Sequence, residues 1–168
     1  LKDDFLILLG RDVEKIEQLY AYHEKKAVFN VDIRDEAALI AFFEGLDSQF
    51  GQIDILVNNA GYAIYDDFEN FSSQQVQAMF DINTFALMTM CRLVGKRMKA
   101  RRSGQIINIV SMSGLIASSK SSVYSATKFA AMGFSNTIRL ELAQYGVTVT
   151  TVNPGPIATG FFDQADPD

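Results

Sequence analysis

Tyr124 and Lys128 are spaced so that both side chains could act on a single substrate atom. Residues four apart lie on one face of a helix. A free tyrosine has a pKa of about 10 and is a poor base at neutral pH, whereas an ammonium within about 4 to 6 Å favours the phenolate and lowers that pKa. The pair therefore suits general acid/base catalysis.

The four-residue spacing alone is not specific, because Tyr22 and Lys26 share it. The two pairs differ in what precedes them. Ser111 stands thirteen residues before Tyr124 and directly after an apolar strand pattern, where a side chain faces the ligand crevice of an open α/β sheet. The residue thirteen before Tyr22 is Leu9, inside a strand pattern. We therefore interpret the Tyr22 pair as solvated surface.

The elements that must position these side chains follow an alternating pattern. Short β-rich apolar runs alternate with amphipathic helical stretches, which is typical of βαβ units on a parallel sheet. Asp35 and Ser72 suit helix N-caps, and no linker divides the chain, so we expect one α/β domain over residues 1–168. We expect strands over residues 5–9, 27–31, 53–57, 105–110 and 147–152, and helices over residues 12–20, 35–50, 72–99 and 122–144.

Composition excludes several classes of function. With 48% hydrophobic and 21% charged residues, the 168-residue chain can bury a sizeable core. The formal net charge of -5 argues against nucleic acid as the main partner. Cys91 is the only cysteine, so neither a disulfide framework nor a cysteine zinc site can form, and we expect a buried, inert thiol. His23 is the only histidine and lies among charged residues, so we expect it to be solvated and to bind no metal.

Two sequence features bear on location and assembly. No stretch approaches the roughly 20 apolar residues that span a bilayer, and no basic segment leads into an apolar one, so we expect no membrane span and a cytoplasmic protein. The apolar residues between Met79 and Val94 leave the helix over residues 72–99 without a broad polar face. We predict a homodimer or homotetramer through the helices over residues 72–99 and 122–144; a central place within its own layer would equally explain the first helix.

Five motifs give the chain a specific resemblance. From its first residues to about Gly160, it resembles the short-chain dehydrogenase/reductase family, whose fold is a Rossmann-type, doubly wound parallel sheet in three α/β/α layers. The matching elements, in the family's order, are Asn58-Asn59-Ala60-Gly61, Asn83 in Asp81-Ile82-Asn83, Ser111 in Val110-Ser111-Met112-Ser113, Tyr124-Ser125-Ala126-Thr127-Lys128, and Asn153-Pro154-Gly155-Pro156-Ile157-Ala158-Thr159.

The resemblance implies a catalytic set of four residues. Tyr124 would be the general acid/base, and Lys128 would lower its pKa and hold the nicotinamide ribose. Ser111 would bind the substrate oxygen and stabilise its developing charge; Ser113 is a rival that only the spacing to Tyr124 disfavours. Asn83 would hold a water that links Lys128 to solvent, and a polar residue on an exposed helix face is the alternative for Asn83.

The resemblance also implies cofactor contacts along the chain. The glycine of the first motif permits close approach of the backbone to adenosine. Asp32, at the end of the second strand, would meet the adenine amino group, although it could instead be a helix N-cap just before Asp35. The cofactor-binding residues implied in this way are Arg11, Asp32, Ile33, Asn59, Ala60, Gly61, Tyr124, Lys128, Pro154, Gly155, Ile157 and Thr159.

The end of the first strand predicts which dinucleotide binds. Members of the family that prefer NAD commonly place an aspartate there to accept from the ribose 2′-hydroxyl. In this chain Gly10 is followed by Arg11. A guanidinium suits a 2′-phosphate and glycine leaves it room, so the sequence favours NADP(H) over NAD(H). Arg11 could also be a surface residue that leads into the helix.

The chain departs from the family at both ends. It lacks the first strand with its glycine-rich loop, and the last strand. In the family, the absent first strand lies between the strands over residues 5–9 and 53–57, so these two strands would be left with unpaired edges. We therefore expect the sequence to be a piece of a longer molecule, with a partial dinucleotide-binding domain.

Together these features predict an oxidoreductase that moves a hydride between NADP(H) and an alcohol or carbonyl. Apolar residues near the expected mouth of the site favour a small, rather apolar substrate. The alternatives are a regulatory module that senses NADP(H), an NAD-preferring dehydrogenase, and a purely structural fragment. The apolar residues are Tyr62, Met112, Leu115, Ile116, Phe161 and Phe162.

Overall fold

The computed structural model describes residues 3–157, apart from the side chain of Asp47. The chain divides into two compact units, Leu1–Gly51 and Gln52–Asp168, which we call unit 1 and unit 2. All five strands of the described residues run parallel, β1 with β2 in unit 1 and β3, β4 and β5 in unit 2. Within residues 3–157, no helix is both long and apolar enough to cross a membrane.

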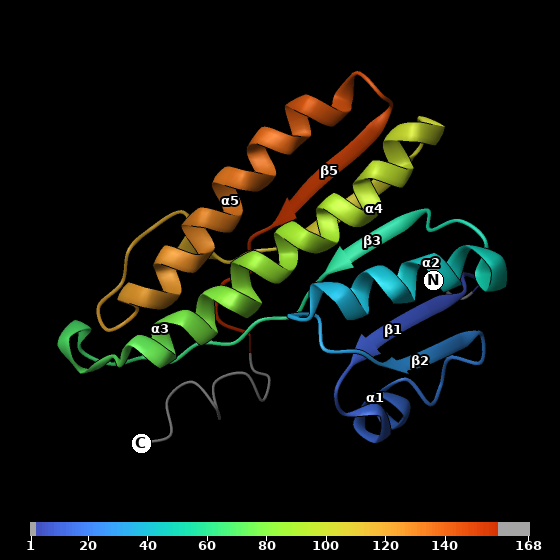
Figure 1. Ribbon diagram of the computed structural model, residues 1–168. Helices are drawn as coiled ribbons and strands as arrows, with labels where there is room; N and C mark the ends of the chain where they lie inside the picture. The colour runs from blue at the N-terminus through green and yellow to red at the C-terminus, as the bar shows by residue number, and fades with distance from the viewer. Residues whose placement is uncertain (1–2, 158–168) are drawn as a thin grey trace. The chain divides into compact units, whose positions relative to one another are not determined.

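Unit 1 is a two-stranded sheet with two helices, α1 and α2; Figure 1 shows it in blue to cyan. Its elements, in chain order, are β1 (Leu6–Gly10), α1 (Val13–Leu19), β2 (Lys26–Asn30) and α2 (Glu36–Phe50). The side chain of Asp35 caps α2 by accepting a hydrogen bond from the Ala38 amide, as the sequence predicts. Leu39, Phe43 and Leu46 on α2 are buried and form the core of the unit.

His23 corrects one expectation. It is buried, with 7% of its surface exposed, and its Nε2 lies 3.0 Å from the backbone oxygen of Asp4. The prediction of a solvated side chain is therefore wrong. The prediction rested on the charged neighbours of His23 in the sequence. Glu24 and Lys25 are indeed exposed, but the imidazole of His23 turns inward beside the start of β1.

Unit 2 is a three-stranded sheet in the order β3-β4-β5, and its long helices α4 and α5 run side by side (Figure 1). Ile55 of β3 is paired with Gln105 of β4, and Gly104 of β4 with Val147 of β5. The elements, in chain order, are β3 (Ile55–Asn58), α3 (Ser73–Phe80), a π-helical turn (Asp81–Ala86), α4 (Leu87–Arg101), β4 (Gly104–Ile109), α5 (Ser122–Ala143) and β5 (Val147–Val152), with short 3₁₀ turns at Phe68–Asn70 and Met112–Gly114.

The observed elements confirm the Rossmann-type α/β fold. Each expected strand and helix is present, with ends that differ by a few residues. Among the described residues, no strand pairs with the second edge of β1 or of β3. One helix differs: the stretch over residues 72–99 is two α-helices joined by the π-helical turn Asp81–Ala86. A capping box between Ser72 and Gln75 starts the first of them.

Candidate functional site

The parallel sheet of unit 2 brings three chain segments to one edge. Because parallel strands in register end on the same side, the residues after β3, β4 and β5 lie together at the carboxyl edge. Two backbone hydrogen bonds hold the last two segments side by side: Val110 N donates to Val152 O at 2.8 Å, and Met112 N donates to Pro154 O at 3.0 Å. This edge therefore carries the first, third and fifth motifs.

Tyr124 and Ser111 meet at this edge, on the first turn of α5 and directly after β4. Both are buried, with exposed fractions of 4% and 9%, and their side chains are hydrogen-bonded. The Oγ of Ser111 also accepts a hydrogen bond from the amide of Ser113 at 3.1 Å. Ser113 thus orients Ser111 through its backbone, and the hydroxyl that contacts Tyr124 is that of Ser111.

Lys128 lies one helical turn beyond Tyr124 and is 5% exposed. Its Nζ is 5.7 Å from the centre of the Tyr124 ring and donates a hydrogen bond to Ile109 O at 3.3 Å. Burial disfavours the ammonium and lowers the pKa of Lys128 to about 8. The cation is therefore still present at neutral pH, although it is held less firmly than on an exposed lysine.

Burial is also the main influence on Tyr124. It raises the pKa of the phenol, and the hydrogen bond with Ser111 acts in the opposite direction with the smaller effect. Tyr124 therefore holds its proton at neutral pH, which suits a proton donor. The expected lowering of this pKa by Lys128 stays a prediction.

Asn83 is fixed inside the π-helical turn by three hydrogen bonds. Its Oδ1 accepts from Tyr62 N at 3.0 Å, and its Nδ2 donates to Tyr62 O at 2.8 Å and to Thr127 Oγ1 at 3.0 Å. At 1% exposure it does not lie on an exposed helix face. Asn83 ties the segment after β3 to α5, and π-helical turns are frequent at functional sites.

Two glycines allow the segments of the site to approach closely. A Cβ on Gly61 would lie 3.0 Å from Asn83 Oδ1 and 3.4 Å from Lys128 Nζ. A Cβ on Gly114 would lie 2.9 Å from the backbone oxygen of Lys128. A larger side chain at Gly61 would crowd the Asn83 amide, and one at Gly114 would collide with the backbone of α5. Gly114 therefore permits the close approach of the loop after β4 to α5.

A buried polar network beneath the site was not predicted from the sequence. Asn58 Nδ2 donates to Asn108 Oδ1 at 2.8 Å and to Cys91 Sγ at 3.3 Å, and Asn108 Nδ2 donates to Ser135 Oγ at 2.8 Å. The network joins β3, β4, α4 and α5. Burial raises the pKa of Cys91 to about 12, which makes it the inert thiol that was expected. The sequence signal that could have revealed this network is a single asparagine inside the apolar run Ile106-Ile107-Asn108-Ile109.

The expected cofactor contacts of unit 1 lie at the carboxyl ends of β1 and β2. The carboxylate of Asp32 accepts hydrogen bonds from Arg34 N at 3.0 Å and from Arg34 Nε at 2.9 Å. This pairing, aided by the positive charge of Arg11, lowers the pKa of Asp32 to about 2 against a smaller effect of burial. The N-cap of α2 is Asp35, so Asp32 is not the helix N-cap that was considered as its alternative role. Ile33 is partly buried.

The remaining predicted contacts follow β3 and β5 in unit 2. Asn59 and Ala60 are exposed, Pro154 is partly buried, and Gly155 and Ile157 are exposed; Thr159 lies outside the described residues. Among the described residues, no donor reaches the buried Oδ1 of Asn153. In the same part of the chain, no group of three His, Cys, Asp or Glu side chains is arranged to hold a metal ion.

The sequence is similar to those of short-chain dehydrogenases. The short chain dehydrogenase family profile matches residues 2–168. A 3-ketodihydrosphingosine reductase from Bacteroides thetaiotaomicron is 35% identical over 133 residues, which cover 79% of this chain and 49% of the relative. The chain thus spans about half the length of that relative.

Solved structures give the same result. A short-chain dehydrogenase from Streptomyces avermitilis superposes with a TM-score of 0.88 at 28% identity, over 95% of this chain and 59% of that protein. The protein ElxO with NADP bound superposes with a TM-score of 0.89 at 26% identity, over 96% of this chain and 67% of that protein.

Proposed function

The chain belongs to the short-chain dehydrogenase family, and from this premise we propose that it transfers a hydride between NADP(H) and an alcohol or carbonyl substrate. The observation that carries the proposal is the buried cluster in unit 2. Tyr124 is hydrogen-bonded to Ser111 and lies beside the ammonium of Lys128. These are a proton donor, an oxygen-binding hydroxyl and a nearby cation at the carboxyl edge of a parallel sheet.

In the direction of reduction, the phenol of Tyr124 gives its proton to the substrate oxygen as negative charge develops there. Ser111 donates a hydrogen bond to the same oxygen and stabilises that charge. Lys128 favours the phenolate that remains. Asn83 is proposed to hold a water through which the proton is replaced. When bound, the nicotinamide supplies the hydride or accepts it in the reverse reaction.

Several features of unit 2 fit a dinucleotide. The buried Oδ1 of Asn153 offers an acceptor without a donor among the described residues, directly before Pro154 and Gly155. Because residue 61 is glycine, no side chain at this position covers the ammonium of Lys128. Contact between this ammonium and the nicotinamide ribose requires such access. Asn59 and Ala60 would line the adenosine side, and Ile157 and Thr159 the nicotinamide and pyrophosphate.

NADP(H) is proposed over NAD(H) because of the charges in unit 1. Two guanidiniums, Arg11 and Arg34, act on the single carboxylate of Asp32, which leaves a net positive charge for a 2′-phosphate. The similar protein ElxO carries NADP. Asp32 and Ile33 would contact the adenine. We take both units to belong to one dinucleotide-binding domain.

A rather apolar substrate is proposed from the turn that follows Ser111. Met112, Leu115 and Ile116 are 38%, 49% and 58% exposed there, so apolar side chains close to Ser111 in the sequence are available to contact a substrate. The similar reductase from Bacteroides thetaiotaomicron is named for 3-ketodihydrosphingosine. Phe161 and Phe162 lie outside the described residues.

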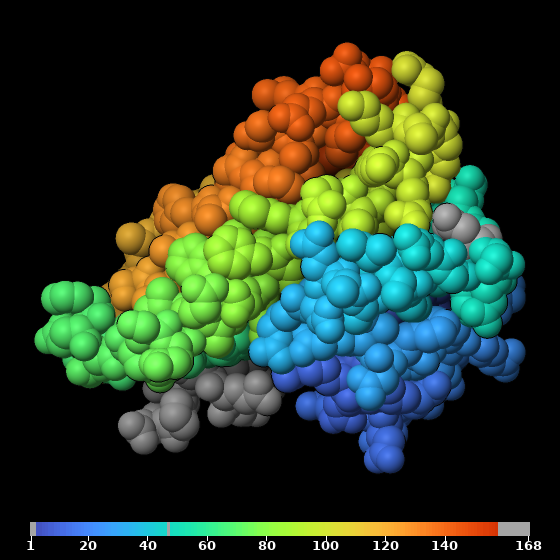
Figure 2. Space-filling model, in the orientation of Figure 1, coloured from blue at the N-terminus to red at the C-terminus, as the bar shows by residue number. Residues whose placement is uncertain are grey.

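A homodimer or homotetramer through the helices over residues 72–99 and 122–144 is part of the proposal. Helix α5 lies at the surface (Figure 2). One side of it is exposed and uncharged, and it includes Phe129 and Leu140, which are 47% and 75% exposed. Gly133 lies on this side, and a Cβ there would have nothing within 4 Å. A mid-helix glycine costs about 0.5–1 kcal/mol relative to alanine, and close contact with a second copy would offset that cost.

Gly133→Ala tests the interface by light scattering. We expect the monomer to become more stable and the oligomer to dissociate more readily. Gly45→Ala is the matched control, because Gly45 lies within α2 and also has nothing near its Cβ; it should leave the mass in solution unchanged. A wild-type protein that is monomeric at all concentrations would contradict the proposal.

Turnover tests the proposed reaction. NADPH absorbance is followed with a panel of ketones and aldehydes, for the wild-type enzyme and for Tyr124→Phe. We expect turnover with some members of the panel and its loss in the variant. Undiminished turnover in Tyr124→Phe would refute the role of Tyr124. NADPH binding without turnover across the panel would instead support a cofactor-sensing module.

A further inference from the structure

The loop after β3 places a second tyrosine against Tyr124. The rings of Tyr65 and Tyr124 have centroids 6.0 Å apart and planes at 61°, an edge-to-face contact. Tyr65 is partly buried and packs on the cluster formed by Ala63, Met79 and Tyr124. Aromatic pairs in this geometry attract one another beyond the area that they bury. Tyr65 therefore restricts the tilt of the Tyr124 ring.

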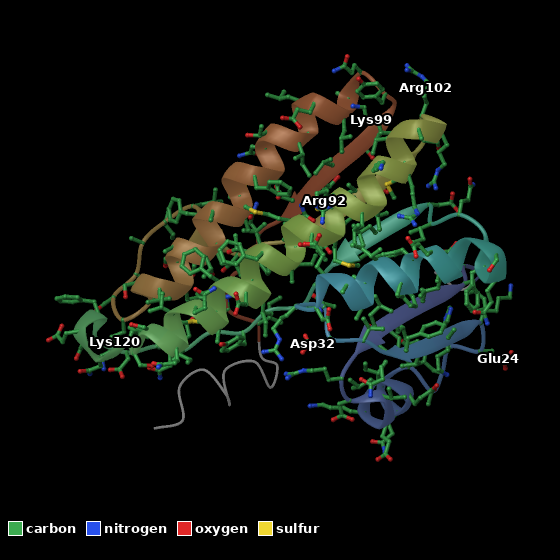
Figure 3. The ribbon with its side chains drawn as sticks, viewed as in Figure 1. Glu24, Asp32, Arg92, Lys99, Arg102 and Lys120 are labelled. Atoms are coloured by element: carbon green, nitrogen blue, oxygen red, sulfur yellow. The ribbon has the colours of Figure 1, made fainter. Side chains whose placement is uncertain are left out.

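The loop is anchored on both sides of Tyr65. On one side, Asn83 binds the backbone N–H and C=O of Tyr62. On the other, Asp66 N donates to Lys120 O at 2.9 Å, and Lys120 lies in the segment just before α5 (Figure 3). Both anchors connect the loop with α5, which carries Tyr124: Asn83 also donates to Thr127 of α5, and Lys120 lies just before this helix. The backbone on both sides of Tyr65 is therefore held in place.

The carboxylate of Asp66, next to Tyr65, is hydrogen-bonded within the loop itself. Asp66 Oδ1 accepts hydrogen bonds from Asn70 Nδ2 at 2.8 Å and from Asp67 N at 2.7 Å. The side-chain bond with Asn70, followed by the backbone bond with Asp67, lowers the pKa of Asp66. Asp66 thus stabilises the turn that follows Tyr65, and Tyr65 supplies the ring of this loop that makes the edge-to-face contact with Tyr124.

We propose that Tyr65 is a positioning residue that holds the Tyr124 ring at a fixed tilt and keeps water from its phenol. The inference rests on the proposed role of Tyr124 as the proton donor. Burial is what opposes ionisation of Tyr124, so a ring that excludes water also keeps the phenol protonated. Neither the family resemblance nor the Tyr-Lys spacing singles out Tyr65, because it lies outside every motif.

The test removes the ring of Tyr65 and measures both the rate and the ionisation of Tyr124. Tyr65→Ala and Tyr65→Leu remove the aromatic contact, and the leucine variant keeps apolar bulk should alanine prevent folding. Tyr65→Phe keeps the ring. Phe71→Ala is the matched control, because Phe71 packs on the same cluster and forms no ring contact with Tyr124 in the described structure. Thermal unfolding and NADPH fluorescence check that each variant folds and binds cofactor.

Removal of the ring should lower kcat about tenfold, a fraction of what misplacement of a reacting group can cost, with the KM for NADPH unchanged. Water that reaches the phenol favours the phenolate, so the pKa of Tyr124 falls. Since reduction needs the protonated phenol, the alkaline limb of the pH–rate profile should move to lower pH. Phenolate absorbance, with Tyr124→Phe as the reference, should shift in the same direction. Tyr65→Phe should restore most of the rate.

Three results would decide the matter. A Tyr65→Leu or Tyr65→Ala enzyme with the wild-type pH profile and rate would overturn the inference. Phe71→Ala with the same shift in profile would also overturn it, because general loosening of the cluster would then suffice. Full turnover by Tyr124→Phe would instead refute the proposed function, so the two failures are distinguishable.

Discussion

The two units hold their candidate functional residues in different ways. In unit 2, Asn83, Ser111, Tyr124 and Lys128 are each at most 9% exposed and are fixed by hydrogen bonds from several elements. In unit 1, Asp32 and its partner Arg34 are 32% and 40% exposed and interact as an ion pair. Desolvation shifts the pKa values of buried groups, which adapts them to proton transfer. An exposed ion pair, in contrast, contributes little to the stability of the fold. We infer that unit 2 holds the groups proposed for the chemistry together with part of the cofactor site, whereas unit 1 contributes to binding alone.

Lys128→Met is the sharpest way to break the comparison. The variant keeps an apolar side chain of similar length but loses the ammonium next to Tyr124. We expect kcat to fall about 100-fold, the low end of what a general acid/base contributes, and NADPH to bind more weakly. Steady-state kinetics and cofactor fluorescence measure both. A variant with wild-type kcat would show that the buried cluster is structural.

The same variant makes a prediction about stability. Burial lowers the pKa of Lys128 from 10.5 to about 8, so the unfolded chain binds the proton more tightly than the folded chain. Between pH 8 and 10.5 the unfolded state therefore holds more protons, and stability rises with pH across this window. Lys128→Met should remove this dependence and raise the melting temperature at neutral pH. A melting temperature below that of the wild type would contradict burial as the cause.

Asn108→Ala tests whether the polar network beneath the site supports unit 2. The substitution leaves the Asn58 amide and the Ser135 hydroxyl without Asn108 as a partner. An unsatisfied buried polar group costs about 1–3 kcal/mol, so we expect a loss of about 2 kcal/mol or more in the free energy of unfolding. Urea unfolding measures the loss. Thr148→Ala, at an exposed position of β5, is the control and should change stability far less.

Arg11→Ala tests the binding role of unit 1. Hydrogen bonds to charged groups contribute about 1.5–3 kcal/mol, so the Kd for NADPH should rise about 10-fold to 100-fold while that for NADH changes little. The kcat at saturating NADPH should remain close to the wild-type value, in contrast to Lys128→Met. Titration with both dinucleotides measures the effect. Equal weakening of NADPH and NADH would argue for the NAD-preferring alternative.

The sequence predicted the regular elements well because their signals are local. The helix over residues 122–144 corresponds to α5 (Ser122–Ala143), and the strand over residues 105–110 to β4 (Gly104–Ile109). Asp35 was correctly predicted as an N-cap, since capping depends on three neighbouring residues. The π-helical turn was missed because one extra residue in a helical turn leaves the apolar pattern almost unchanged.

The parts of the site that escaped prediction depend on contacts between distant segments. Tyr65 reaches Tyr124 across 59 positions because Asp66 is bonded to Lys120 and Tyr62 to Asn83. No periodicity in either segment encodes such a contact. The proposed catalytic set was predicted from spacing and resemblance, whereas its buried environment, which raises the pKa of Tyr124, could come only from the packing.

Arg34→Gln should have the smallest effect, and it sharpens the contrast between the units. The pair with Arg34 lowers the pKa of Asp32 from 3.8 to about 2, so the folded state binds this proton less tightly than the unfolded state. The stabilisation is present above pH 3.8 and is lost as the pH falls toward 2. Because both side chains are about one-third exposed or more, solvent screening limits it to about 0–1 kcal/mol.

The measurement is urea unfolding of the wild type and of Arg34→Gln at pH 7 and near pH 3. The small difference in stability at pH 7 should shrink at the lower pH, where protonation of Asp32 in the unfolded state cancels the gain. Arg139→Gln, an exposed residue of α5 whose guanidinium contacts only an amide among the described residues, should show no such pH dependence. A loss as large as that of Asn108→Ala would mean that the ion pair of unit 1 stabilises its unit as much as the buried network stabilises unit 2, and the proposed division between binding and chemistry would lose its physical basis.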